Sequence, residues 1–108
     1  MRPIVKFTPG ARKDLRSIHD YISSHDSPEK ADYVAKKIVE AALSLRELLH
    51  RGAYPPELLA IGKRDYRQVF FKPYRILYRD RGDTIHIAAI ADGRRDMQSL
   101  LARRLLGS

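Results

Sequence analysis

The 108-residue chain has no cysteine, which excludes disulfides, thiolate chemistry and zinc sites built on thiolate ligands. It has no glycine-rich phosphate loop, its serines lie in no G-x-S-x-G setting, and its carboxylates are scattered singly. The histidines show no spacing typical of metal ligands; they are His19, His25, His50 and His86. We therefore expect no metal, no cofactor, no nucleophilic triad and no pair of catalytic carboxylates.

Long apolar runs are absent as well. No stretch approaches the ~18 residues that a membrane-spanning helix needs, and Met1-Arg2-Pro3 does not begin a signal peptide. We therefore expect a cytoplasmic protein. The length fits one domain over residues 1–108. With 44% apolar and 31% charged residues, the composition is typical of a folded globular protein rather than a disordered one.

Positive charge is abundant. Lysine and arginine number 21 against 13 aspartates and glutamates, which leaves a formal net charge of +8. A surplus of this size implies a polyanionic partner, which can be nucleic acid or an acidic protein. The charge alone leaves both partners open.

The first half of the chain predicts a short strand followed by two helices. Residues 3–8 are rich in β-forming residues, and Thr8 with Pro9 predicts a helix start. This first helix should end near residues 24–25, and its apolar stripe is Ala11, Leu15, Ile18 and Ile22. Ser27 and Pro28 predict a second start, followed by apolar residues at helical spacing as far as Leu49. Gly52, Pro55 and Pro56 end this helical hairpin.

The second half changes to the period of strands. Residues 66–72, 74–80 and 84–92 predict three sequential antiparallel strands, and Gly82 lies where the second hairpin turn needs a positive φ. Asp96 then starts a short helix with an apolar stripe of Met97, Leu100, Leu101 and Leu105. The predicted fold class is α+β. It has an N-terminal strand, a long helical hairpin packed on an antiparallel sheet, and a short C-terminal helix, in the order β-α-α-β-β-β-α.

Arginines are concentrated on the predicted strands. Alternation places Arg75, Leu77 and Arg79 on one face and Tyr74, Ile76 and Tyr78 on the other. On the preceding strand, one face carries Arg67, Val69 and Phe71, and the other carries Tyr66, Gln68 and Phe70. The last strand divides into Ile85, Ile87, Ala89 and Ala91 against His86, Ala88 and Ile90. We expect the face of Tyr74, or its opposite at Leu77, to lie under the helices.

The polar face would present Arg67, Arg75 and Arg79 on a solvent-facing, concave surface, where guanidinium groups suit phosphate. The alternative is that strand arginines are solvated and only protect the sheet against aggregation. For Arg81 in the turn we favour that alternative.

The chain resembles the RelE/ParE superfamily of type II toxin–antitoxin toxins. The resemblance covers about residues 4 to 106 and rests on "ARKDLRSIHDYI", an alanine-rich second helix and "YRILYRDRGDTIHIAAIADGRRD". It implies a small toxin neutralised by an acidic or partly disordered antitoxin. RelE-like members cut messenger RNA on the ribosome, whereas ParE-like members inhibit DNA gyrase, and the fold does not separate the two branches.

The nuclease pattern transfers onto this chain incompletely. Three basic positions of the pattern fall on Arg67, Arg75 and Arg95. A lysine position falls on Val69, although Lys72 is nearby. The expected tyrosine position falls on Leu101. Arginine is a poor base because its pKa exceeds ~12. The resemblance therefore favours a ParE-like, non-enzymatic gyrase inhibitor. The alternatives are a ribosome-dependent mRNA endonuclease using those four basic residues and, less favoured, a nontoxic nucleic-acid-binding module.

We also expect arginines and leucines near the C-terminus to contact a protein partner, first of all the antitoxin. These are Arg75, Arg79, Arg94, Arg95, Leu100, Leu101 and Leu105.

Overall fold

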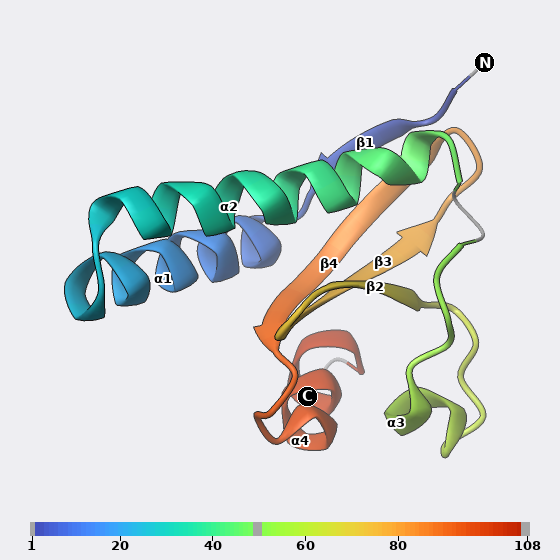
Figure 1. Ribbon diagram of the computed structural model, residues 1–108. Coiled ribbons are helices and arrows are strands. Elements are labelled where there is room, and N and C mark those ends of the chain that lie inside the picture. The colour runs from blue at the N-terminus through green and yellow to red at the C-terminus, as the bar shows by residue number, and fades with distance from the viewer. Residues whose placement is uncertain (1, 49–50, 107–108) are drawn as a thin grey trace.

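The structure, a computed structural model, describes residues 2–48 and 51–106 (Figure 1). The elements are β1 (Ile4–Phe7), α1 (Pro9–His25), α2 (Pro28–Leu43), the 3₁₀ turn η1 (Ser44–Arg46), α3 (Pro56–Leu59), β2 (Arg67–Phe71), β3 (Tyr74–Asp80), β4 (Thr84–Asp92) and α4 (Met97–Leu105). The predicted α+β class is confirmed. Two short elements, η1 and α3, were not predicted.

The three longest helices start where the sequence predicts. The side chains of Thr8, Ser27 and Asp96 each accept a hydrogen bond from the backbone N–H three residues later, at 3.0–3.1 Å. Such a cap satisfies one of the N–H groups that a helix start leaves without a partner. Local chemistry therefore sets these three boundaries.

The second helix is shorter than predicted. We expected it to continue towards Leu49, which lies outside the described residues, but α2 ends at Leu43 and continues as η1. The Ser44 hydroxyl donates to the Ala41 carbonyl at 2.6 Å, and a serine that bonds the backbone in this way competes with regular helix. The tighter 3₁₀ turn places Leu45, which is fully buried, in the core.

The four strands form one mixed sheet in the order β1-β4-β3-β2. Strands β2, β3 and β4 pair antiparallel as predicted, and Gly82 in the β3–β4 turn has φ 88°. The sequence left the partner of β1 open. It pairs parallel with β4, with Ile4–Phe7 beside Thr84–Ile87, and the sheet is therefore not purely antiparallel.

A bulge in β4 overturns part of the predicted alternation. Leu77 pairs with Ala89 and the next residue, Tyr78, pairs with Ile87, so Ala88 is an extra residue. After this extra residue, the side chains of β4 point to the sheet faces opposite to those that simple alternation predicts. Ile90 therefore joins Ile85 and Ile87 on one face, whereas we expected it on the opposite face.

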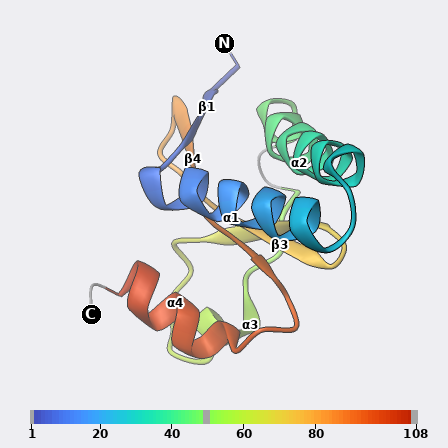
Figure 2. The ribbon, with the colours of Figure 1, turned by 90° about the vertical axis from the view of Figure 1, so that its left-hand side faces the viewer.

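The sheet separates two apolar layers. Helices α1 and α2 cover one face, and α4 with α3 lies at the other (Figure 2). The face of Ile76 and Tyr78 packs under the helical hairpin, which confirms the first of the two predicted alternatives. The second layer joins Leu58 of α3 and Leu77 to three residues of α4, namely Met97, Leu100 and Leu101. Each fully buried Leu or Ile contributes about 1.5–3 kcal/mol, and these two layers therefore hold the sheet from both sides.

Within the two described stretches, no helix is both long enough and apolar enough to cross a lipid bilayer.

Candidate functional site

Arg75 does not lie on an open surface. Only 8% of the residue is exposed, because the segment carrying α3 covers this part of the sheet. Its guanidinium donates to Glu57 Oε1 at 2.7 Å and Oε2 at 2.9 Å, and its Nε donates to Gln68 Oε1 at 2.7 Å. The expectation of a solvent-facing arginine at this position was therefore wrong, since α3 supplies an acidic partner that was not anticipated.

The Glu57 carboxylate stays ionised in this pair. Its hydrogen bonds from Arg75 hold the pKa of Glu57 below its ordinary value, against the opposing effect of burial. A bidentate pair of this kind occupies the guanidinium fork that would otherwise bind phosphate oxygens. In this conformation the charge of Arg75 is balanced within the protein.

Arg67 lies on the other face of the sheet from Arg75. The β2–β3 register places Arg67 opposite Tyr78 and Phe70 opposite Arg75, and directly opposite residues share a face. The prediction that Arg67 shares a face with Arg75 and Arg79 was therefore wrong, because the register could not be read from each strand separately. Arg67 and Arg79 nevertheless line one hollow at the edge of the sheet.

The remaining nuclease-pattern residues do not join Arg67 or Arg75. Lys72 is exposed in the β2–β3 turn, and Arg95 is exposed beyond the end of β4. Leu101, at the expected tyrosine position, is 1% exposed in the second apolar layer. With Arg75 buried against Glu57 and Arg67 on the opposite face, the structure does not bring the four basic residues to one site.

The residues expected to bind a partner fall into two groups. Arg94 is exposed, and its guanidinium donates hydrogen bonds to Asp92 Oδ1 at 2.9 Å and Oδ2 at 2.5 Å. These bonds lower the pKa of Asp92. Arg95 and Arg79 are also accessible. Leu100 and Leu101 belong to α4 and are buried where it packs in the second apolar layer, and Leu105 is half-buried. In this conformation Arg79, Arg94 and Arg95 are available to a partner. Arg75, Leu100 and Leu101 are buried and are not available.

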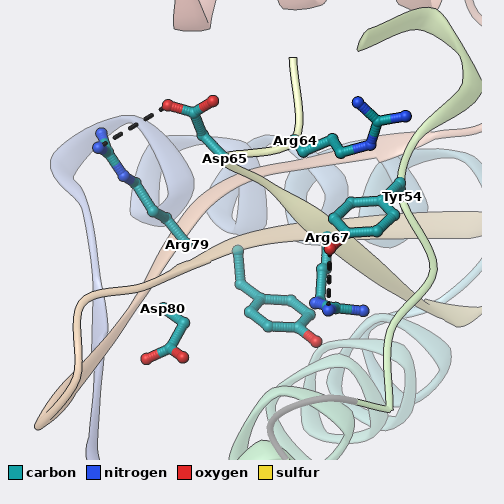
Figure 3. A pocket seen from close by; sticks show the side chains of 7 residues that line it. Tyr54, Arg64, Asp65, Arg67, Arg79 and Asp80 are labelled. Carbon is teal, nitrogen blue, oxygen red and sulfur yellow. Dashed lines mark hydrogen bonds and ion pairs between the residues drawn. The ribbon is translucent and has the colours of Figure 1, made fainter. Parts of the chain in front are cut away.

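One hollow, which we call the basic pocket, lies at the outer edge of the β2–β3 pair (Figure 3). Its volume is about 320 Å³, and it is lined by Tyr54, Arg64, Asp65, Arg67, Tyr78, Arg79 and Asp80. The Arg67 guanidinium lies 4.4 Å above the Tyr54 ring and donates to the Tyr54 hydroxyl at 3.1 Å and the Gly52 carbonyl at 2.9 Å. Tyr54 and Arg64 were not predicted as site residues, since nothing local in the sequence indicates that they meet β2.

A second hollowed surface, the aromatic trough, lies at the opposite end of β3. It consists of two adjoining hollows of about 460 and 370 Å³ that share Tyr21 and Tyr74, with Arg94 and Arg95 lining the larger one and Lys72 the smaller. The Tyr21 ring is 64% exposed and stacks on His25 with ring centroids 4.1 Å apart. Tyr21 was not predicted as a site residue. The signal in the sequence is a large aromatic residue at the border of the apolar stripe of its helix.

The trough borders a stretch of β4 that has no strand on its outer side. Strand β1 pairs with β4 only as far as Ile87, while Ile90 and Ala91 line the larger hollow. Burial and the nearby Asp92 carboxylate raise the pKa of Tyr74, so its phenol is neutral at ordinary pH. The trough therefore combines neutral aromatic rings with exposed arginines.

Among the residues that the structure describes, no three histidine, aspartate or glutamate side chains gather to hold a metal ion. Arginine, tyrosine and aspartate line both the basic pocket and the aromatic trough, and the trough adds Lys30, Lys72 and His25. That chemistry suits anion binding and protein contact.

The helical hairpin on a four-stranded sheet is the architecture of RelE/ParE-superfamily toxins, and two solved structures show the likeness. One is a chromosomal ParDE toxin–antitoxin system from P. aeruginosa, with TM-score 0.71 and 27% identity over 84% of this chain and 96% of that one. The other is the toxin–antitoxin complex RelBE2 from Mycobacterium tuberculosis, with TM-score 0.57 and 25% identity over 85% of this chain and 99% of that one.

The sequence comparison is more specific. Residues 5–97 match the family described as ParE toxin of type II toxin-antitoxin system, parDE. The chain therefore belongs to the ParE toxin family. No curated protein sequence matches it significantly.

Proposed function

We propose that this toxin inhibits growth by contacting DNA gyrase and that it is not itself an enzyme. The observation that carries the proposal is the state of Arg75, which is closed off by Glu57 instead of facing a substrate. Membership in the ParE family supports the same branch. The toxin then acts by occupying a protein surface.

The dispersal of the titratable groups supports this choice over RNA cleavage. A nuclease needs a base within hydrogen-bond reach of the 2′-hydroxyl and cations on the same phosphate. His86 lies near the start of β4 and Arg95 lies beyond its end, and the strand between His86 and Asp92 spans roughly 20 Å. Leu101 offers no proton, so among the described positions of the nuclease pattern no base lies beside the cations.

The direct test is DNA supercoiling by purified gyrase. We expect micromolar toxin to inhibit supercoiling, and we expect toxin premixed with its antitoxin not to inhibit. Primer extension on translated message in poisoned cells is the parallel measurement and should show no codon-phased cuts. Unaffected supercoiling together with such cuts would replace the gyrase proposal with the ribosome-dependent endonuclease.

We further propose that an acidic antitoxin binds this toxin and that the aromatic trough receives part of it. The support is the pair of similar structures, which are both from toxin–antitoxin systems. The net charge of +8 favours an acidic partner. Exposed Tyr21, with Arg94 and Arg95 nearby, offers both an apolar anchor and charge complementarity.

A further inference from the structure

The basic pocket lies apart from the aromatic trough that we propose for the antitoxin, and its side chains are arranged for an anion. We propose that it binds a phosphodiester group of a nucleic-acid backbone. Binding of a nucleic acid here is independent of the gyrase proposal, because it is tested without gyrase.

Arg67 is held ready for a ligand. A guanidinium has five N–H donors, and Arg67 uses one on the Gly52 carbonyl and one on the Tyr54 hydroxyl. The Tyr54 ring beneath it fixes the plane of the guanidinium at 4.4 Å. Because neither partner carries a negative charge, the positive charge of Arg67 is not balanced as that of Arg75 is.

Arg64 supplies a second cation. It is exposed in the loop that precedes β2, and it forms no hydrogen bond or ion pair with any other residue that the structure describes. Figure 3 shows its guanidinium on the same side of the pocket as Tyr54. Two cations around one hollow suit the oxygens of a phosphodiester.

Two aspartates also line the pocket, and their effect is limited. The Asp80 Oδ1 accepts the Gly82 N–H at 2.8 Å, and Asp65 lies 3.9 Å from the Arg79 guanidinium. Three arginines against two aspartates leave the lining positive. Two chain neighbours of the lining residues, Lys63 and Arg81, add to this charge.

The composition of the lining favours a nucleic acid over an acidic peptide. Five of its seven residues are charged and the other two are tyrosines, so a peptide would find no aliphatic anchor there. Arginine next to tyrosine is the combination that holds a sugar–phosphate backbone and its neighbouring bases. The aliphatic and aromatic surface that a peptide needs lies in the trough, at the other end of β3.

The test measures binding of fluorescein-labelled 20-nucleotide DNA and RNA and of a 20-base-pair DNA duplex by anisotropy, at 50 and 200 mM salt. We expect binding that weakens with salt. Arg64→Ala should weaken it several-fold and reduce the slope of log K against log salt by about one phosphate contact. Asp65→Asn should strengthen it, because the substitution removes a carboxylate and releases Arg79.

Arg16→Ala is the matched control. Arg16 is exposed on α1, away from the pocket, and without a partner in the described chain, so this variant carries the same loss of charge. If Arg64→Ala and Arg16→Ala weaken oligonucleotide binding equally, the loss reflects net charge alone, and the proposed site would be overturned. Inorganic phosphate that binds at millimolar concentration while all three oligonucleotides fail to bind would also overturn it, in favour of a free anion. The three oligonucleotide arms distinguish DNA from RNA as the source of the backbone.

Discussion

Glu57 and Arg75 form an ion pair in which the arginine side chain is 9% exposed and the glutamate 25%. Removing one member of such a pair leaves the other desolvated without its counter-charge. The pair also fastens α3 to the sheet beside Leu58, which is 2% exposed. One carboxylate therefore decides both the conformation of this segment and the accessibility of Arg75.

We expect Glu57→Gln to lower the free energy of unfolding by about 2 kcal/mol at pH 7, since it removes a charge-assisted bidentate contact. Urea denaturation measures this change. The same substitution at Glu40, whose exposed pair with Lys37 spans 3.5 Å, is the control and should cost at most about 0.5 kcal/mol. Equal losses from the two variants would contradict the importance of the buried pair.

The same pair predicts how the loss depends on pH. Folding holds the pKa of Glu57 below its ordinary value of 4.5, so the ionised carboxylate stabilises the fold above that pH. This contribution is lost as the pH falls through the folded-state pKa. The difference between wild type and Glu57→Gln should therefore shrink as the pH is lowered from 7 towards 3.

At the level of elements, the bulge in β4 requires support from two helices. It disturbs the ladder around Ala88 and Ile90 at the point where β1 has already ended. Asp14 of α1 accepts the Ile90 N–H at 3.0 Å, and Arg104 of α4 donates to the Ala88 carbonyl at 3.2 Å. Arg104 and Asp14 also bond each other at 2.8 and 2.9 Å. The N-terminal and C-terminal helices are thereby joined across the open edge of β4.

We expect Asp14→Asn to loosen α4, because it keeps an acceptor for the Ile90 N–H but removes the ion pair with Arg104. The measurement is amide hydrogen exchange over residues 97–105, where protection should fall by about tenfold, or ~1.4 kcal/mol. Asp20→Asn, at an exposed position on the same helix, should leave α4 unchanged. Unaltered exchange in the Asp14 variant would show that the apolar contacts of Leu100 and Leu101 hold α4 alone.

Over the whole molecule, the two hollowed surfaces lie at opposite ends of β3. Tyr74 lines the aromatic trough, while Tyr78 and Arg79 line the basic pocket. Such separation allows one small chain to bind a protein at one end and a polyanion at the other.

This arrangement predicts a local effect on antitoxin binding. The double substitution Arg94→Glu and Arg95→Glu should weaken antitoxin affinity at least tenfold, because it places like charges opposite an acidic partner. Isothermal titration with the purified antitoxin measures it. Arg16→Glu with Arg12→Glu, on α1, is the charge-matched control. A comparable loss in both double variants would show that overall charge, rather than the trough, attracts the antitoxin.

Local sequence chemistry predicted most of the secondary structure. The capping residues Thr8, Ser27 and Asp96 act within three residues of themselves, and the turn at Gly82 depends on its own φ, so both could be read from the chain. Membership in the toxin superfamily could be predicted as well, because it depends on the order and spacing of motifs from Tyr74 to Asp96, which are visible in the sequence. The family match confirmed this membership.

The tertiary structure alone decided what the arginines do. Strand register placed Arg67 on the face opposite Arg75, the bulge at Ala88 moved Ile90 to the other side, and α3 brought Glu57 to Arg75 from 18 residues away. Each of these depends on pairing between distant segments, which local propensity does not contain. The sequence by itself therefore determined a basic α+β toxin with arginines on its strands. Burial and register then determined that Arg75 is paired with Glu57, whereas Arg64 and Arg67 line the basic pocket without a hydrogen bond or ion pair to a carboxylate in the described chain.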